Sequence, residues 1–170
     1  MSVTGVQTCA LPICSTVTLD DTEVAPVFVG KKPSQTDFEA TTQIDFQPQQ
    51  INETAGMTVR QNERQHYEFG IQKSVKGREL FLRYVIGSIR PTVLTRPIPD
   101  GLVKLKVRGF PKYYRFSYAI GDGEFIEIGG VETKYLESTD GLNSVMIGLF
   151  ASGNGRERSE ERRVGKECCR

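Results

Sequence analysis

The sequence has no tryptophan, a single histidine and no apolar run of the roughly 18 residues that a membrane-spanning helix needs. It also lacks an excess of either charge, because 22 Lys and Arg residues face 21 Asp and Glu residues and leave a formal net charge of +1. Such a chain has no overall field that would attract nucleic acid or anionic lipid. We therefore expect neither nucleic acid nor a membrane among its partners.

Cysteine is missing from the whole middle of the chain. The four cysteines lie at the two ends, where an even count ordinarily indicates disulfides: Cys9, Cys14, Cys168 and Cys169. The stretches VTGVQTCALPI (3–13) and RSEERRVGKEC (158–168), however, look like in-frame translations of two common short-read sequencing adapters, each over eleven residues. We therefore reject the disulfide interpretation and expect both ends to be artefacts of an untrimmed metagenomic contig.

This interpretation divides the chain into three parts. Residues 1–14 and 158–170 are adapter-derived, and 15–157 form a natural domain that is incomplete at both ends. The first fourteen residues are uncharged and 156–170 hold six basic and four acidic residues, so 15–155 retain 16 basic and 17 acidic residues and no cysteine. This length and the overall composition, 38% hydrophobic and 25% charged, fit one globular domain.

Apolar and polar residues alternate along the natural segment. Residues 38–46 place apolar side chains on one face of an extended chain and polar ones on the other, which predicts a half-buried strand. The same period of two recurs in four later runs: Tyr67–Ile71, Leu80–Ile86, Tyr114–Ile120 and Val145–Leu149. No stretch of twelve residues has the periodicity of an amphipathic helix.

Turn-forming residues separate these runs at short intervals: Lys76-Gly77, Pro99-Asp100-Gly101, Gly121-Asp122-Gly123, Gly129-Gly130 and Asp140-Gly141. The segment 121–124 is the clearest hairpin turn, because alternating apolar residues flank it on both sides. About ten short strands with regular turns predict an all-β fold, an antiparallel β-sandwich of the jelly-roll type, with a closed barrel as the alternative.

Several segments taken together resemble the C-terminal concanavalin A-like β-sandwich domain that follows the catalytic propeller in family 43 β-xylosidases and α-L-arabinofuranosidases. They occur in the family's order: Pro26–Gln49, Glu53–Ile71, Pro99–Val107, Tyr113–Phe125 and Val145–Gly155. The resemblance implies a concanavalin A-like jelly roll.

The resemblance also implies that the chain is not itself an enzyme, because the family's catalytic carboxylates lie in the propeller. We expect a non-catalytic accessory domain of an enzyme acting on xylan or arabinoxylan oligosaccharides. Its partners would be the propeller of the same protein and, through the parent enzyme, a xylo- or arabino-oligosaccharide. The resemblance implies a soluble protein, cytoplasmic or secreted with the parent, and no cofactor, with a structural calcium left open. The alternative functions are a free-standing carbohydrate-binding module and an unrelated jelly-roll interaction protein.

In family β-xylosidases one loop of the sandwich reaches the substrate pocket and narrows it with an aromatic side chain. By motif order this loop falls within 137–144, so the resemblance implies a pocket role for Asp140, Gly141, Leu142 and Asn143. Leu142 stands where family members often carry phenylalanine. The departure puts aromatic closure of the pocket in doubt, although leucine can still exclude water. An ordinary hairpin loop is the alternative.

Other candidate residues have simpler interpretations. We expect the lone His66 to be a surface or packing residue rather than a metal ligand or catalytic base. Carboxylates that alternate with apolar residues fit a solvated sheet face: Glu39, Asp45, Glu68, Glu124 and Glu127. Sugar-binding modules present aromatic rings to sugars, but the aromatic residues at 114, 116 and 118 share a strand face and predict core. Tyr113, out of phase with them, is the best exposed candidate for a sugar contact.

Overall fold

The computed structural model describes residues 17–51, 53–136 and 145–153, and these ranges form ten strands and one short 3-10 helix. The elements are β1 (Phe28–Lys31), β2 (Phe38–Ile44), β3 (Thr54–Asn62), β4 (Gln65–Ser74), β5 (Gly77–Ile86), β6 (Thr92–Pro97), β7 (Val103–Gly109), β8 (Tyr113–Ile120), β9 (Ile126–Glu132), η1 (Thr133–Leu136) and β10 (Met146–Ser152). None of the helices in the described ranges is long and apolar enough to cross a membrane. The predicted adapter-derived ends, 1–14 and 158–170, lie outside the described residues.

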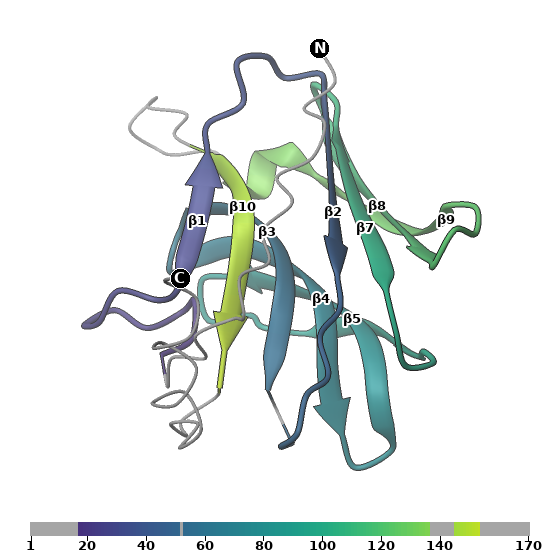
Figure 1. The fold of residues 1–170 in the computed structure, drawn as a ribbon. Helices are drawn as coiled ribbons and strands as arrows, with labels where there is room; N and C mark the ends of the chain where they lie inside the picture. Colours follow the sequence, from purple (N-terminus) through teal and green to yellow (C-terminus); the bar gives the residue numbers. More distant parts are fainter. Residues whose placement is uncertain (1–16, 52, 137–144, 154–170) are drawn as a thin grey trace, which may run out of the picture.

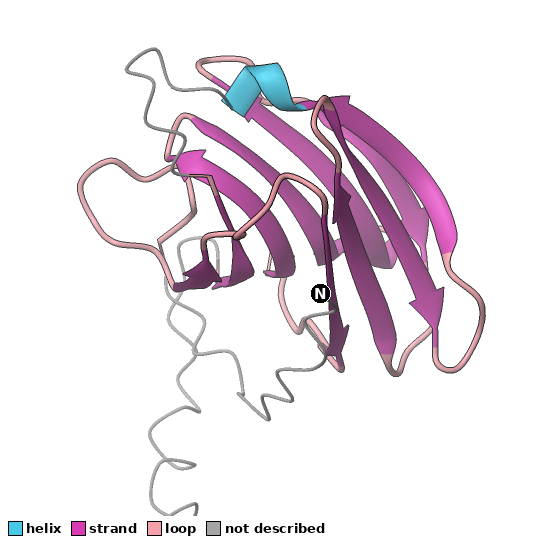
Figure 2. Ribbon diagram, turned by 90° about the horizontal axis from the view of Figure 1, so that it is seen from above, coloured by secondary structure: helices cyan, strands magenta, loops and turns pink. Residues whose placement is uncertain are grey.

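The strands form two antiparallel sheets that face each other (Figures 1 and 2). One has six strands in the order β1-β10-β3-β4-β5-β6, and the other has four in the order β2-β7-β8-β9. The chain moves from β2 to the meander β3–β6 in the opposite sheet, returns for β7–β9, and then inserts β10 between β1 and β3. Two separate sheets confirm the predicted β-sandwich and exclude the closed barrel.

The space between the sheets holds the main hydrophobic core. The alternating runs predicted from the sequence supply Tyr67, Phe69, Ile71, Leu80, Leu82 and Phe116, all fully buried. Strands β3 and β7, which are not among those runs, add the fully buried Val59, Val103, Leu105 and Val107. Tyr114 and Tyr118 belong to the same core, at 7% and 5% exposure, as their shared phase with Phe116 predicts. Because successive strand residues point to opposite faces, the alternation of apolar and polar residues turns the apolar face of each strand toward the core.

Most of the predicted turns are confirmed. Gly77, Gly101 and Gly121 adopt positive φ values of 112°, 107° and 53°, which residues with a Cβ rarely adopt. The hairpin predicted at 121–124 joins β8 to β9. The turn predicted at Gly129-Gly130, however, is wrong, because both glycines lie inside β9.

A β-bulge explains the two glycines in β9. The β8–β9 register shifts between Phe116 and Ser117, and Gly129 and Gly130 follow this shift on the partner strand. A Cβ atom on Gly130 would lie only 2.9 Å from the carbonyl oxygen of Tyr114. Gly130 therefore permits close approach of main chains rather than a change of direction, whereas a Cβ atom on Gly129 would make only an ordinary contact, 3.5 Å from Leu82.

A second, smaller apolar cluster lies on the outer face of the six-stranded sheet. Leu19, from the segment that precedes β1, is only 2% exposed and packs with Phe81 and Phe150, with Phe28 beside them. The strands beneath have glycines in their central positions, since Gly56 pairs with Gly70 between β3 and β4. The N-terminal segment is thereby anchored on the sheet.

Candidate functional site

One end of the sandwich is organised around η1. The main-chain N–H of Thr133 donates to the carbonyl oxygen of Lys112 at 3.0 Å, and its hydroxyl donates to that of Pro111 at 3.2 Å. Gln65 donates from Nε2 to the carbonyl oxygen of Tyr135 at 3.2 Å. The helix is thus fastened both to the β7–β8 turn and to the start of β4.

This end also carries both flanks of the predicted pocket loop. Leu136, the last residue of η1, is fully buried in the core, and β10 begins at Met146. The loop residues themselves lie outside the described residues: Asp140, Gly141, Leu142 and Asn143. Their role stays a prediction, while the positions of their two flanks are known.

Tyr113 begins β8 at the same end and lines a shallow pocket on the outer face of the four-stranded sheet. The ring is 37% exposed, as its phase relative to Tyr114 predicts. The pocket measures about 250 Å³ and is lined by Tyr113, Arg115, Glu127, Gly130, Val131 and Glu132. The sugar contact predicted for Tyr113 is untested, but the structure places polar side chains around it.

Aromatic and cationic groups hold the Tyr113 ring. Its centroid lies 4.6 Å from that of Phe110, and the guanidinium of Arg115 lies 5.2 Å from the Tyr113 ring and 5.7 Å from the Phe110 ring. The guanidinium of Arg108 approaches Phe110 at 4.8 Å. These distances fall within the range of cation–π attraction. The contacts therefore restrict the orientation of the Tyr113 ring on the surface.

Two carboxylates complete the pocket. Glu127 accepts a hydrogen bond from Nη1 of Arg115 at 3.2 Å, and Glu132 pairs with Lys134 at 2.5 Å. Tyr113 lies directly opposite Glu132 in the β8–β9 ladder. The pocket therefore combines an exposed ring, a guanidinium donor and carboxylate acceptors, which suits the binding of a hydroxyl-rich molecule.

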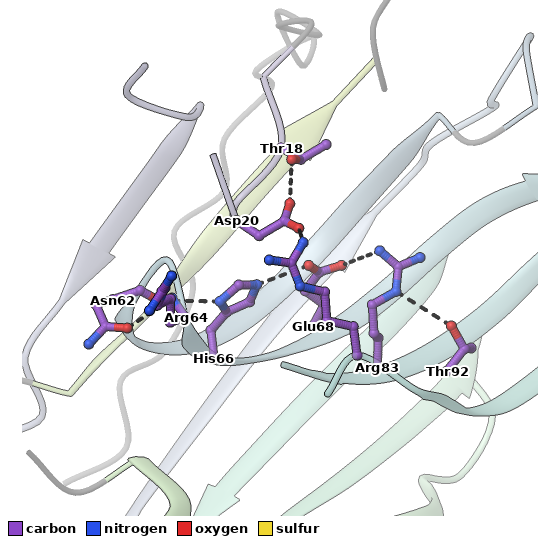
Figure 3. Close-up of polar contacts among 9 residues, drawn as sticks. Thr18, Asp20, Asn62, Arg64, His66, Glu68, Arg83 and Thr92 are labelled. Atoms are coloured by element: carbon purple, nitrogen blue, oxygen red, sulfur yellow. Dashed lines mark hydrogen bonds and ion pairs between the residues drawn. The ribbon is translucent and has the colours of Figure 1, made fainter. Parts of the chain in front are cut away.

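The densest polar cluster lies on the outer face of the six-stranded sheet (Figure 3). His66 is fully buried, with Nδ1 3.2 Å from the carbonyl oxygen of Asn62 and Nε2 3.1 Å from Oε1 of Glu68. The other carboxylate oxygen of Glu68 accepts from Arg83 at 3.3 Å, and Nε of Arg83 lies 3.4 Å from the hydroxyl of Thr92. One continuous chain of contacts thus crosses four strands, from Asn62 in β3 to Thr92 in β6.

Both ring nitrogens of His66 are engaged by these two contacts, one with the Asn62 carbonyl oxygen and one with the Glu68 carboxylate. A histidine without exposure and with both nitrogens engaged has no free position for a substrate or a metal ion, so the packing role predicted for His66 describes it best.

An ion pair beside this cluster ties down the N-terminal segment. Asp20 accepts hydrogen bonds from Arg90 and from the hydroxyl of Thr18. Burial raises the pKa of Asp20, but the Thr18 hydrogen bond and the charge of Arg90 outweigh it, so the pKa lies below its ordinary value of 3.8. Asp20 thus fastens the segment next to the buried Leu19.

The predicted solvated face is correct for most of the five carboxylates but wrong for Glu68. Asp45, Glu124 and Glu127 are exposed and Glu39 is half-buried, whereas Glu68 is only 4% exposed. Glu68 is buried because the outer face of β4 is covered and its charge is paired within the sheet. Among the described residues, no group of three His, Cys, Asp or Glu side chains could hold a metal ion.

A second pocket, which the sequence did not indicate, lies between the N-terminal segment and β3. It measures about 440 Å³ and is lined by Asp21, Thr22, Glu23, Val24, Ala25, Pro26, Phe28 and Arg60. The guanidinium of Arg60 lies 5.7 Å from the centre of the Phe28 ring, and its Nε is buried without a partner among the described residues. Burial lowers the pKa of Arg60, although Glu63 partly offsets this effect.

Comparison with models of protein families shows to which family the chain belongs. The model of the β-xylosidase C-terminal concanavalin A-like domain matches residues 13–161, which is most of the chain. The chain belongs to this family. The match covers the C-terminal domain of family 43 glycoside hydrolases and not their catalytic propeller.

Individual relatives agree with this assignment. The chain is 27% identical over 138 residues to the non-reducing end α-L-arabinofuranosidase BoGH43B of Bacteroides ovatus, a match that covers 79% of this chain and 26% of that enzyme. In the solved structure of GH43B from the Bacteroides ovatus xyloglucan utilisation locus, a domain superimposes with a TM-score of 0.76 at 24% identity, covering 84% of this chain and 29% of that one.

More distant structures share the fold. The xylan β-1,4-xylosidase of Bacillus halodurans superimposes with a TM-score of 0.75 at 16% identity and is covered over 29% of its length, against 84% of this chain. The family 43 protein BlXynB of Bacillus licheniformis gives 0.76 at 19% identity, covering 85% of this chain and 29% of that one. The chain thus spans less than a third of the length of these relatives.

Proposed function

We propose that this chain is the non-catalytic accessory domain of a family 43 glycoside hydrolase that acts on xylan or arabinoxylan oligosaccharides. The observation that carries the proposal is how much of each chain the matches cover. About four fifths of this chain, 79% and 84%, corresponds to only 26% and 29% of enzymes named as an arabinofuranosidase and a xylosidase. In such an arrangement the sandwich packs on the propeller and stabilises it.

The end of the sandwich that carries η1 is the surface we assign to the propeller. Both flanks of the segment 137–144 emerge there, which supports the proposal that the substrate pocket faces this end. Leu142 would shape the pocket by excluding water rather than by aromatic contact. The oligosaccharide is then bound by the parent enzyme, with this domain contributing one apolar side chain.

A chimera tests the proposal. The C-terminal domain of the Bacteroides ovatus arabinofuranosidase would be replaced by residues 15–157 of this chain, and hydrolysis of a nitrophenyl arabinofuranoside would be compared with that of the propeller alone. We expect the chimera to be more active and more stable than the isolated propeller, and Leu142→Gly to lower kcat/KM without lowering the melting temperature. A chimera no better than the isolated propeller would contradict the accessory role.

A free-standing carbohydrate-binding module is the second candidate, and the pocket beside Tyr113 favours it. A module would leave hydrolysis of a small soluble substrate unchanged in the chimera and increase only the hydrolysis of insoluble xylan. The same experiment therefore separates the two functions.

A further inference from the structure

We propose that the pocket beside Tyr113 is a binding subsite for one sugar ring of a neutral pentose oligosaccharide, separate from the predicted pocket loop. The pocket lies on the outer face of the four-stranded sheet and is lined from β8 and β9, whereas Leu142 belongs to the segment between η1 and β10. The subsite itself is inferred from the lining of this shallow pocket. The choice of a pentose rests on the proposed function.

The exposed ring of Tyr113 gives the pocket an apolar wall. Sugar rings present flat faces of C–H groups, and an aromatic side chain buries such a face at little conformational cost. Of the two tyrosines at this end with comparable exposure, Tyr113 at 37% lines the pocket, and Tyr135 at 39% is not among its lining residues. This difference makes Tyr135 a matched control.

The polar groups determine what kind of molecule fits. Arg115 can only donate hydrogen bonds, whereas the carboxylates of Glu127 and Glu132 can only accept them. A hydroxyl group both donates and accepts, so neighbouring hydroxyls on one ring can satisfy both kinds of partner. Because Arg115 pairs with Glu127 and Lys134 pairs with Glu132, the charges around the pocket balance and favour neither an anionic nor a cationic ligand. A neutral polyol is therefore the ligand class that matches.

The site is preorganised by the sheet. Arg115 is held by its 3.2 Å bond to Glu127 and by the Phe110 and Tyr113 rings. Gly130 forms part of the lining without a side chain, and its main chain lies too close to the carbonyl oxygen of Tyr114 to accommodate a Cβ atom without displacement. Groups on paired strands lose little freedom when a ligand binds, which favours affinity.

The size of the pocket limits both the ligand and the affinity. Its volume of about 250 Å³ lies just below the range of roughly 300–1,000 Å³ typical of sites for drug-sized ligands, so it accommodates about one sugar ring. With one aromatic face and three charged groups, all of them about half exposed, we expect a dissociation constant of about 1–10 mM for a short oligosaccharide. This affinity suits a subsite that holds a chain already engaged elsewhere in the enzyme.

The test uses this chain and xylotriose. We expect ¹H–¹⁵N chemical-shift changes that are confined to the ends of β8 and β9 and saturate with a dissociation constant of about 1–10 mM. Tyr113→Ala and Arg115→Gln should each lower the affinity for xylotriose by about fivefold or more. Tyr113→Phe keeps the ring and should bind like the natural chain. Tyr135→Ala should also bind unchanged, and circular dichroism with melting temperatures would verify that all variants are folded.

Three results would overturn the proposal. They are the absence of chemical-shift changes at about 20 mM xylotriose, a concentration above the expected dissociation constant, chemical-shift changes located outside β8 and β9, and unchanged binding by Tyr113→Ala. Tighter binding of glucuronate than of xylotriose would overturn the assignment of a neutral ligand. The outcome does not depend on the propeller, because binding is measured on this chain alone. If the chimera fails but xylotriose binds, the accessory role is rejected and the subsite stands. If the chimera is active but xylotriose does not bind, the subsite is rejected and the accessory role stands.

Discussion

Gly56 on β3 and Gly70 on β4 face each other on the outer side of the six-stranded sheet, and neither position has room for a methyl group. A Cβ atom on Gly56 would lie 2.2 Å from the carbonyl oxygen of Phe69 and 2.5 Å from the Cα of Gly70. A Cβ atom on Gly70 would lie 2.3 Å from the carbonyl oxygen of Ala55. The central strands of the sheet therefore depend on two glycines at one cross-strand pair.

Substituting Gly56 by alanine should strongly destabilise the domain. The atoms in the way belong to the main chain, so strands β3 and β4 must separate, and we expect a loss of about 2 kcal/mol or more in the free energy of unfolding. Gly129→Ala is the matched control, because its Cβ would lie 3.5 Å from Leu82, an ordinary contact. Urea unfolding measures both variants. Equal effects would show that the close approach at Gly56 is not limiting.

Removing the charge of Glu68 should also lower stability, because its carboxylate joins His66 to Arg83 at a site with 6% side-chain exposure. We expect Glu68→Gln to cost about 1–3 kcal/mol, since the amide keeps only one acceptor oxygen and turns an NH₂ group toward either His66 or Arg83. The control is Glu39→Gln, which breaks the partly exposed pair with Lys106 at 3.5 Å and should change stability by about 0.5 kcal/mol or less. A Glu68 variant as stable as the Glu39 variant would contradict the role of this network.

Alkaline pH should destabilise the domain through its buried tyrosines. Burial raises the pKa of Tyr67 and of Tyr84 above the ordinary value of 10.0. Above pH 10 the folded state therefore keeps these phenols protonated while the unfolded state loses their protons. The contribution of the two tyrosines to the free energy of unfolding is complete below pH 10 and declines as the pH rises above it. Above the unfolded-state pKa, each such tyrosine lowers the free energy of unfolding by about 1.4 kcal/mol per pH unit until its folded pKa is reached.

The variant Tyr67→Phe isolates this effect. At pH 7 it should be less stable by about 1 kcal/mol, because the hydroxyl donates to the carbonyl oxygen of Glu132 at 3.1 Å. The difference from the natural chain should shrink as the pH rises above 10 and then reverse. Urea midpoints at pH 7, 10 and 11 measure it, and a constant difference over this range would reject the assignment.

Leu19 should anchor the N-terminal segment to the outer face of the sheet. It is 2% exposed and packs with Phe81 and Phe150, so Leu19→Ala leaves a cavity and should cost about 2–4 kcal/mol. Leu102 is 38% exposed, and Leu102→Ala should cost less than half as much. Hydrogen exchange would locate the loss: we expect faster exchange of the main-chain N–H groups of β5 and β10. Equal losses for the two leucines would contradict the anchoring.

The core was predictable because its signal is local. Tyr67, Phe69 and Phe116 follow a period of two in the sequence, and this period alone places them between the sheets. The same reasoning placed Tyr113 on the exposed side, since it is out of phase with the core residues of its strand. Fold class and core membership therefore follow from positions a few residues apart.

The burial of Glu68 could not be predicted in this way. Its own strand alternates like a strand with one solvated face, but the segment that carries Leu19 and Asp20 lies on the outer side of the same sheet. No pattern within β4 indicates that a distant segment covers it. The same reason applies to the pocket at Arg60, which the N-terminal segment and β3 form together.

The residue that lies opposite Tyr113 on β9 could not be predicted by counting from the hairpin turn either. Tyr118 pairs with Ile126 and Ser117 with Glu127, but the bulge then shifts the register, so Phe116 pairs with Gly129 and Tyr113 with Glu132. Regular counting from the turn would have placed Val131 opposite Tyr113. The glycines at 129 and 130 mark this irregularity in the sequence, but a Gly-Gly pair by itself predicts a turn just as well.

The central claim is that this domain supports a glycosidase propeller and has no hydrolytic activity of its own. Long-read sequencing of the source DNA across both ends of this reading frame tests it most directly. The account predicts an upstream coding region for a propeller with paired carboxylates, a downstream region that completes the sandwich, and neither of the stretches 3–13 and 158–168. A locus that begins and ends as the 170-residue chain does, without a propeller, would contradict the accessory role.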